Sequence, residues 1–347
     1  MALFGLGGSS RTVGLDIGSG LLKLVVVDHA KGEPILSGVS VTPVLADAIV
    51  EGEIMDPGIV SDTIQGLVKS AGLKQKRVVV AVGGRDVIIK KIQVDRMKES
   101  EAFEVVRWEA QQHVPFDIEA VELDFQILDP EGEGLQMDVL LVAAKRDLVE
   151  DKVQLLAQAG LEAEIVDVDA FALHNAFGLN HPEAMEGVAA LLNTGHELTN
   201  VNVLDEGIPL LTRDLTIGTR KVREDLQRER GLSADDADAL LKGFERSPDL
   251  DPFVQSWGDE IAVGVERASA FLQSASREAG AIQRVYCCGG GARIPGLTEV
   301  LGQRLNLPVE VANPIQRLKV KDGVFDAINV DEVAPLLMLA TGLALRS

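Results

Sequence analysis

The stretch VGLDIGSGLLKLVVVD, residues 13–28, carries the first indication of the fold. An apolar run ends at Asp16, a Gly-Ser-Gly turn follows, and a second apolar run begins at Leu21. Two half-buried runs about a glycine turn are typical of adjacent strands joined by a tight connection. The backbone amides of such a turn can converge on a phosphate, and glycine is needed where a ligand approaches the main chain. The stretch therefore predicts a strand pair whose turn can bind phosphate.

The polar residues around this turn suggest separate roles. Gly18 and Gly20 leave the main chain accessible. Ser19 offers a hydroxyl donor, and Lys23 offers a nearby cation. Asp16 repels phosphate but can hold Mg²⁺, usually through water, so that the metal bridges it to the phosphates. Taken alone, the motif is equally compatible with a plain hairpin in which Asp16 caps the turn.

The same pattern returns at residues 187–218, GVAALLNTGHELTNVNVLDEGIPLLTRDLTIG. Residues 193–195 (NTG) stand where residues 16–18 (DIG) stand in the first copy, and helical patterns follow both copies. Two strand–turn–strand copies suggest a duplicated α/β domain pair. Turns that face each other from two such domains can hold a polyphosphate between them.

A third glycine-rich turn lies at residues 287–296, CCGGGARIPG. Its three consecutive glycines separate a buried strand from a helix that we expect to begin near Pro295. A flat glycine surface lets a purine or a ribose lie against the backbone, and a helix N-terminus nearby favours anions. Neither the dinucleotide-binding fingerprint nor the P-loop pattern is present.

Residues 84–140 predict a small α/β unit inserted in the first domain. A strand over 87–94 precedes a helix that we expect to begin at a Ser100 cap and to stop before Pro115, and two paired strands flank an EGEG turn. In a chain with only 4% aromatic residues, this unit holds Phe103, Trp108, Phe116 and Phe125. These side chains either fill the core of the unit or line a groove for a partner.

Apolar spacing elsewhere predicts further helices. The expected ranges are 61–71 with Ser61 as the N-cap and Gly72 just past the end, 146–160, 170–177, 259–279, and a buried C-terminal helix over 333–345. Residues 231–258 are acidic and end in a proline-rich loop, which indicates a small surface subdomain.

Composition limits the class of protein. The chain has 54 acidic and 33 basic residues and a net charge of -21, which argues against a nucleic-acid partner. The adjacent Cys287 and Cys288 are expected to be buried thiols rather than a disulfide or a metal pair. No apolar run reaches the roughly 18 residues needed to span a bilayer, and residues 1–12 lack the features of a secretory signal. We therefore expect a flexible N-terminal tail and a cytoplasmic protein.

Three glycine-bearing turns in this order, across a duplicated α/β pair, resemble the actin-like ATPase superfamily. DIGSGLLKL resembles its first phosphate motif, LLNTGHELTNVNVL its second, and VYCCGGGARIPGL its adenosine motif. A narrower resemblance, within the FtsA-like branch, is to the PilM family of type IV pilus assembly. It rests on QQHVPFDIEAVELDFQIL, AAKRDLVEDKVQLLAQAGLEAEIVDVDAFALHNAF and GIPLLTRDLTIG, and it covers nearly the whole chain.

The resemblance implies an α/β protein with the actin-like ATPase fold, in which two duplicated RNase H-like domains carry an inserted 1C-type subdomain. The implied division is 13–83, 141–186 and 331–347 in domain 1A, 84–140 in subdomain 1C, 187–230 and 259–330 in domain 2A, and 231–258 in subdomain 2B.

The resemblance also implies ATP and Mg²⁺ as ligands, with Asp16 directed to the metal. The residues that match the motifs are Asp16, Gly18, Ser19, Gly20 and Lys23 in the first phosphate motif, Asn193 and Gly195 in the second, Gly218 and Thr219 in the turn after it, and Gly289, Gly290 and Gly291 in the adenosine motif.

Two departures from the family pattern bear on catalysis. Asn193 replaces the aspartate that usually begins the second phosphate motif, and Leu198 replaces a frequent hydroxyl residue. An amide does not balance a cation as a carboxylate does, so we expect ATP to bind and its hydrolysis to be weak or absent. Asp167 and Asp169 lie where the superfamily often carries a catalytic acid, and Asp169 is equally suited to capping the following helix.

The implied function is that of an ATP-binding scaffold at the cytoplasmic face of the inner membrane, touching the membrane only through its partners. In the PilM family, the groove between domain 1A and subdomain 1C receives the N-terminal cytoplasmic peptide of PilN, and members also connect to pilus motor ATPases. Self-association stays open. Two alternatives share the fold: a filament-forming FtsA-like membrane tether, and a sugar-kinase-like phosphotransferase.

Overall fold

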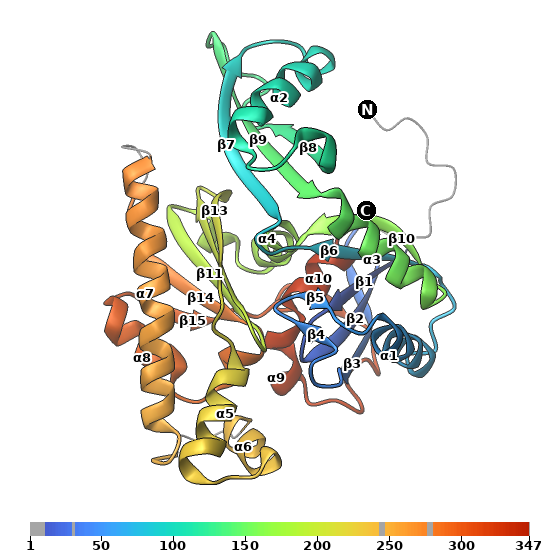
Figure 1. The fold of residues 1–347 in the computed structure, drawn as a ribbon, viewed down its shortest axis with the longest axis vertical. Helices are drawn as coiled ribbons and strands as arrows, with labels where there is room; N and C mark the ends of the chain where they lie inside the picture. The colour runs from blue at the N-terminus through green and yellow to red at the C-terminus, as the bar shows by residue number, and fades with distance from the viewer. Residues whose placement is uncertain (1–10, 30–31, 243–246, 276–279, 347) are drawn as a thin grey trace.

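A computed structural model describes residues 11–29, 32–242, 247–275 and 280–346. The described chain forms two lobes, each built on a sheet, and a smaller unit that projects from the first lobe (Figure 1). Residues 1–10, which make up most of the expected N-terminal tail, lie outside the described residues.

The first sheet contains the strand pair expected around the first glycine turn. Its strands are β1 (Arg11–Ile17), β2 (Leu21–Asp28), β3 (Ile35–Pro43), β6 (Arg77–Val82), β10 (Glu162–Val168) and β16 (Lys319–Val320), in the order β10-β6-β1-β2-β3-β16. β1 and β2 pair antiparallel along their whole length, so the expected strand pair is confirmed. β16 comes from a segment that we expected in the second domain, yet it pairs with β3.

The second sheet repeats the arrangement of the first. It consists of β11 (Val188–Thr194), β12 (Thr199–Asp205), β13 (Ile208–Leu215), β14 (Arg284–Cys288) and β15 (Val309–Val311), in the order β13-β12-β11-β14-β15. In each sheet the first three strands pair antiparallel, and the first strand then pairs parallel with a later one. The shared order confirms the predicted duplication.

Helices cover both sheets and separate them. α1 (Pro57–Ser70) and α3 (Arg146–Gln158) pack on one face of the first sheet, and α5 (Thr219–Arg230), α6 (Ala234–Leu241), α7 (Asp251–Ala275) and α8 (Leu297–Leu305) pack on the second. α4 (Asp169–Asn180) and α10 (Met338–Ala344) lie between the sheets. Both helices share a buried cluster with Leu191 of β11 and Tyr286 of β14, so the lobes meet through this layer.

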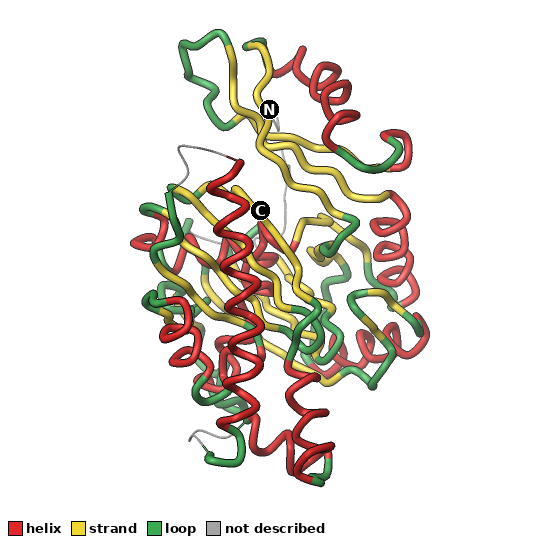
Figure 2. Tube along the Cα trace, turned by 60° about the vertical axis from the view of Figure 1, so that its left-hand side comes forward, coloured by secondary structure: helices red, strands yellow, loops and turns green. Residues whose placement is uncertain are grey.

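The inserted unit is a three-stranded antiparallel sheet with one helix. It consists of β7 (Val87–Asp95), α2 (Glu99–His113), β8 (Val121–Ile127) and β9 (Gln136–Lys145), in the order β7-β9-β8. Ala102, Val106 and Ala110 of α2 are buried against the sheet. Figure 2 shows the unit standing apart from the two large sheets. The pairing of β8 with β9 confirms the predicted hairpin, and β9 continues past the boundary expected at residue 140.

The remaining elements are short. They are the strands β4 (Ile49–Val50) and β5 (Glu53–Ile54), the helix α9 (Val330–Val333), and 3-10 turns at Ile118–Ala120, Pro182–Met185, Gly290–Arg293 and Ala334–Leu337. The expected C-terminal helix is buried, but Pro335 lies in the 3-10 turn that precedes α10. Cys287 and Cys288 are buried and free, as expected. Among the helices of the described residues, none combines the length and the apolar character needed to cross a membrane.

Two predicted helix caps are wrong. α1 begins at Pro57, and the Asp56 carboxylate accepts the Ile59 amide at 3.0 Å, so Ser61 lies buried inside the helix. Proline is well suited to the first turn because its missing N–H is not needed there. In the inserted unit, α2 begins one residue before Ser100 and has no side-chain cap.

The start of α7 is also earlier than expected. The helix begins at Asp251 rather than at 259, so the loop expected before it is shorter. Pro252, which indicated a loop, lies in the first turn of the helix, where proline is tolerated. Residues 276–279, expected at the end of this helix, lie outside the described residues.

Candidate functional site

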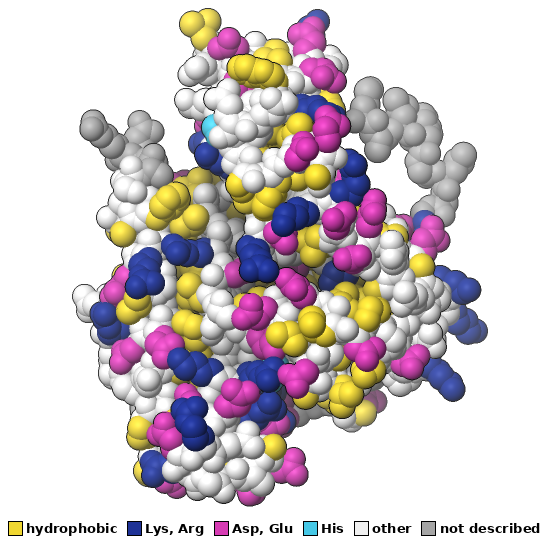
Figure 3. All heavy atoms as spheres, viewed as in Figure 1, with side chains coloured by type: hydrophobic (Ala, Val, Ile, Leu, Met, Phe, Trp, Pro, Cys, Tyr) yellow, Lys and Arg dark blue, Asp and Glu magenta, His cyan; other side chains and the backbone are white. Residues whose placement is uncertain are grey.

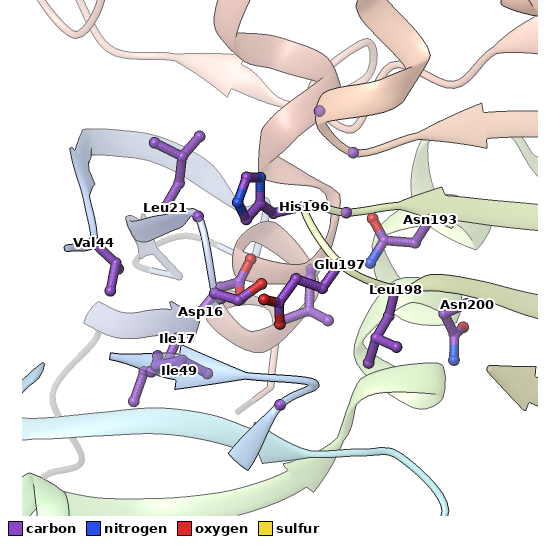
Figure 4. Close-up of a pocket in the computed structure, with 18 of the residues that line it drawn as sticks. Asp16, Ile17, Leu21, Val44, Ile49, Asn193, His196, Glu197, Leu198 and Asn200 are labelled. Atoms are coloured by element: carbon purple, nitrogen blue, oxygen red, sulfur yellow. The ribbon is translucent and has the colours of Figure 1, made fainter. Parts of the chain in front are cut away.

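The two glycine turns face each other between the lobes. The Gly18 amide donates to Leu21 O at 3.3 Å, and the Gly195 amide donates to Leu198 O at 2.8 Å, so both turns close in the same way. A Cβ placed on Gly20 would lie 2.9 Å from the Cβ of His196. Only glycine permits this approach. Figure 4 shows His196 and Glu197 extending from the second turn toward the first lobe.

A cavity of about 490 Å³ lies between the turns. Its volume is within the range of small-molecule and cofactor sites. The structure brings most of the residues predicted from sequence into its wall, namely Asp16, Gly18, Ser19, Gly20, Lys23, Asp169, Asn193, Gly195, Thr219, Gly289 and Gly290.

Three predicted residues lie outside the cavity wall. Asp167 is buried, accepts the Val168 amide and pairs with Arg346 at 3.1 Å. A Cβ on Gly218 would lie 2.2 Å from a backbone oxygen, and one on Gly291 would lie 2.4 Å from a threonine side chain. These two glycines therefore allow close packing behind the turns.

The residues at the base of the two turns differ in charge. In the first copy, the Asp16 carboxylate pairs with the Lys23 ammonium at 2.7 Å, and both side chains are mostly buried. In the second copy, Asn193 and Asn200 occupy the matching register. The Asn200 amide donates to Asp214 at 2.6 Å. Of the two matching pairs of positions, the one in the first lobe carries an ion pair and the one in the second lobe carries two amides.

The cavity contains acidic and basic groups that the sequence did not single out. Lys152 of α3 and Asp214 of β13 line it together with Asp169. Burial, and then the Asp16 carboxylate, raise the pKa of Asp169 to about 7, against the opposing effect of Lys152. Burial lowers the pKa of Lys152, and nearby carboxylates oppose this. Lys152 was missed because it lies in an ordinary amphipathic helix with no motif around it.

Three residues of the cavity wall also have a buried polar atom with no hydrogen-bond partner among the described residues. The Nε atoms of Arg223 and Arg293 and the Oδ1 atom of Asn200 are buried without a hydrogen bond, and all three residues line the cavity. These three atoms are shielded from solvent, so a ligand in the cavity would meet the other groups of its wall rather than these atoms. Backbone amides, cations and a glycine surface together fit a nucleotide.

The acidic groups do not form a metal site on their own. Among the described residues, no group of three or more His, Cys, Asp or Glu side chains could hold a metal ion. Mg²⁺ is commonly held by one or two carboxylates, water and the phosphates of a bound substrate. A single carboxylate such as Asp16 therefore fits Mg²⁺ only together with a nucleotide.

Two sheets with the same strand order, helices between them and a cavity under paired glycine turns define an actin-like ATPase fold. The chain belongs to the family described as type IV pilus assembly protein PilM, whose profile matches residues 14–347. Both resemblances predicted from the sequence are thereby confirmed.

Solved structures agree with this assignment. A chain of a "PilM-PilN type IV pilus biogenesis complex" is 29% identical, with 96% of this chain and 98% of that chain covered and a TM-score of 0.83. The ethanolamine utilization protein EutJ from Carboxydothermus hydrogenoformans is 17% identical, with 97% of this chain and 90% of that chain covered and a TM-score of 0.58. MreB5 of Spiroplasma citri bound to ADP is 11% identical, with 96% of this chain and 95% of that chain covered and a TM-score of 0.51. The last two show a shared fold.

Proposed function

We propose that this protein is a cytoplasmic, ATP-binding scaffold of the type IV pilus assembly complex, held at the inner-membrane face by its partners. The observation that carries the ATP assignment is the cavity between two glycine turns, with basic side chains and a glycine surface in its wall. The ADP bound to MreB5, which has the same fold, supports a nucleotide in this cleft.

Different residues of the cavity would bind different parts of the nucleotide. The amides at Gly18, Gly20 and Gly195 would face the phosphates, and Gly289 and Gly290 would lie against the nucleoside. When Mg²⁺ is bound it would balance the phosphate charge beside Asp16. The second turn offers an amide in place of a carboxylate, so we expect hydrolysis to be weak or absent.

Calorimetric titration with Mg-ATP tests this assignment. Asp16→Ala removes the carboxylate proposed for the metal and leaves Lys23 without its partner, so we expect binding to fall below detection. Asn193→Asp restores the usual carboxylate of the second motif and should bind Mg-ATP at least as well as the native protein. Native affinity in Asp16→Ala would contradict the metal assignment, and measured transfer of phosphate to a sugar would favour the phosphotransferase alternative.

We further propose that the inserted unit binds the N-terminal cytoplasmic peptide of PilN together with domain 1A. A similar protein forms a complex with PilN. Of the four aromatic side chains in the unit, Phe116 and Phe125 pack against its core, whereas Phe103 is 44% and Trp108 61% exposed. Figure 3 shows hydrophobic side chains on this unit and where it meets the body. Exposed aromatic side chains are frequent energetic centres of interfaces.

Tryptophan fluorescence can follow this interaction. The chain has two tryptophans, and Trp257 is buried, so a Trp257→Phe variant reports Trp108 alone. We expect the PilN peptide to shift its emission, and we expect calorimetric titration, which needs no tryptophan, to show that Trp108→Ala weakens peptide binding about tenfold or more. Leu135→Ala, at a 90% exposed position of the same unit, is the matched control and should leave affinity unchanged. Equal affinities for all variants would place the peptide elsewhere.

Contacts with pilus motor ATPases and self-association are further parts of the proposal. Native mass spectrometry of the purified protein measures the oligomeric state and any co-purified nucleotide in one experiment. A filament-forming tether would appear as a series of oligomers, whereas a scaffold would appear as a small defined species.

A further inference from the structure

The segment between β3 and α1 forms a small hairpin beside the cavity. It covers residues 44–56, contains β4 and β5, and contributes several residues to the cavity wall. We call it the cleft hairpin. Asp47 and Glu51 both take a left-handed backbone conformation in it, with φ of 63° and 50°. Aspartate tolerates this conformation, and Glu51 takes it in the two-residue turn between β4 and β5, so contacts with the rest of the molecule, rather than backbone strain, fix the position of the hairpin.

Two of these contacts come from the second lobe. Arg220 Nη1 donates to Asp47 Oδ1 at 2.9 Å, and the Glu51 amide donates to Glu197 Oε2 at 2.5 Å. Arg220 Nη1 also donates to Glu197 Oε1 at 2.9 Å. The contacts form a continuous polar chain from Asp47 of the first lobe, through Arg220 and Glu197 of the second lobe, to Glu51 of the first lobe. We call its four residues, Asp47, Glu51, Glu197 and Arg220, the interlobe latch.

The two latch residues of the second lobe are fixed to the second glycine turn. Glu197 belongs to the turn, and its side chain is 8% exposed. Arg220 lies in the first turn of α5, where its amide donates to His196 O at 2.8 Å. The preceding amide, of Thr219, donates to Gly195 O at 3.0 Å. Any displacement of the turn by a ligand therefore shifts both residues.

The latch also places a carboxylate beside the turn that we assign to phosphate. Glu197 follows Gly195 by two positions, and Arg220 balances its charge. Contacts with Glu224, Glu197 and Asp47 raise the pKa of the Arg220 guanidinium. A polyphosphate in the cavity would repel Glu197 and compete for Arg220. Nucleotide binding and the intact latch therefore oppose each other.

We propose that the interlobe latch holds the cleft hairpin closed in the nucleotide-free protein and must open before a nucleotide binds. The proposal rests on the proposed function, because it takes a nucleotide as the ligand of the cavity. A contact that must break before a ligand binds lowers the apparent affinity by reducing the population of the binding-competent state. Removing the latch should therefore tighten nucleotide binding, chiefly by faster association.

Asp47→Asn is the variant that tests the latch. It removes one charge and keeps the size of the side chain, and asparagine tolerates the left-handed conformation of this position. Glu53→Gln is a matched control in the same hairpin. Its native side chain is 66% exposed, against 67% for Asp47, but it pairs with Arg85 inside the first lobe. A general effect of lost negative charge would appear in both variants.

The first measurement is hydrogen exchange of the nucleotide-free protein, read by mass spectrometry over residues 44–56. We expect faster exchange in Asp47→Asn and native exchange in Glu53→Gln. The second is stopped-flow binding of a fluorescent ATP analogue with Mg²⁺. We expect Asp47→Asn to bind about two- to fivefold more tightly, as suits the loss of one partly exposed ion pair, while Glu53→Gln, whose native side chain also lines the cavity, tightens binding less.

The outcomes separate the latch from the function on which it rests. Native exchange in Asp47→Asn overturns the latch, and faster exchange with unchanged or weaker binding overturns its role in nucleotide entry. Equal tightening in both variants also overturns it, because charge alone then explains the effect. If the native protein fails to bind the analogue, the proposed function fails, and hydrogen exchange still decides whether the latch holds the hairpin.

Discussion

At the scale of single residues, the most unusual group in the cleft is Asp169. It is the first residue of α4, and its side chain lines the cavity. The sequence suggested either a catalytic acid or a helix cap. The structure shows no side-chain cap at the start of α4, and burial beside the Asp16 carboxylate raises the pKa of Asp169 to about 7. Near neutral pH this carboxyl group is therefore only partly ionised.

The raised pKa has a consequence for stability. Below pH 3.8 the side chain is protonated in the folded and the unfolded chain, so it contributes no pH dependence. Between pH 4 and about 7 the unfolded chain loses the proton first, so stability falls as pH rises. We expect Asp169→Asn to raise the free energy of unfolding at pH 8 by at most about 4 kcal/mol, with little change near pH 4.

Thermal denaturation of the native protein and of Asp169→Asn, measured from pH 4 to pH 8, checks this expectation. The difference in Tm should grow over the same range in which the native protein loses stability. A difference in Tm that does not change with pH would mean that burial in this cleft does not raise the pKa of Asp169.

At the scale of elements, the glycine turns were predictable because each depends on neighbouring residues. Asp16 to Leu21 and Asn193 to Leu198 are short stretches, and strand pairing brings their ends together. The roles of Glu197 and Arg220 were not predictable. Arg220 meets Asp47 across 173 positions, and no local pattern encodes that contact. The local sequence also gave a wrong N-cap for α1, because it contains two residues suited to capping and the helix uses Asp56 rather than Ser61.

The contact between α4 and α10, the two helices that lie between the sheets, depends on a glycine. A Cβ placed on Gly342 would lie 1.6 Å from the backbone oxygen of Ala172. Gly342→Val would therefore force the two helices apart, and we expect it to destabilise the protein by about 3 kcal/mol or more. Urea denaturation measures this loss.

Gly66 provides the matched control. It lies in α1 with no atom within 4 Å of a built Cβ. Gly66→Ala should stabilise the protein by about 0.5–1 kcal/mol, because alanine restricts the unfolded chain. Similar effects of both substitutions would show that the helix contact does not require glycine.

At the scale of the whole molecule, the duplication explains why the cleft exists. Two sheets with one strand order place equivalent turns at equivalent ends, and the layer of α4 and α10 sets them opposite each other. The sequence revealed this plan because both copies keep the strand–turn–strand pattern. It could not reveal the closed cleft hairpin or the groups at the cavity wall, such as Lys152 and Arg223, because these meet only after the lobes pack.

The most direct test of the central claim is a crystal structure of the protein grown with Mg²⁺ and a non-hydrolysable ATP analogue. We expect the phosphates between Gly18–Gly20 and Gly195, the nucleoside against Gly289 and Gly290, and Arg220 no longer bridging the lobes. An empty cavity with Arg220 still on Asp47, in crystals grown with saturating analogue, would contradict the account.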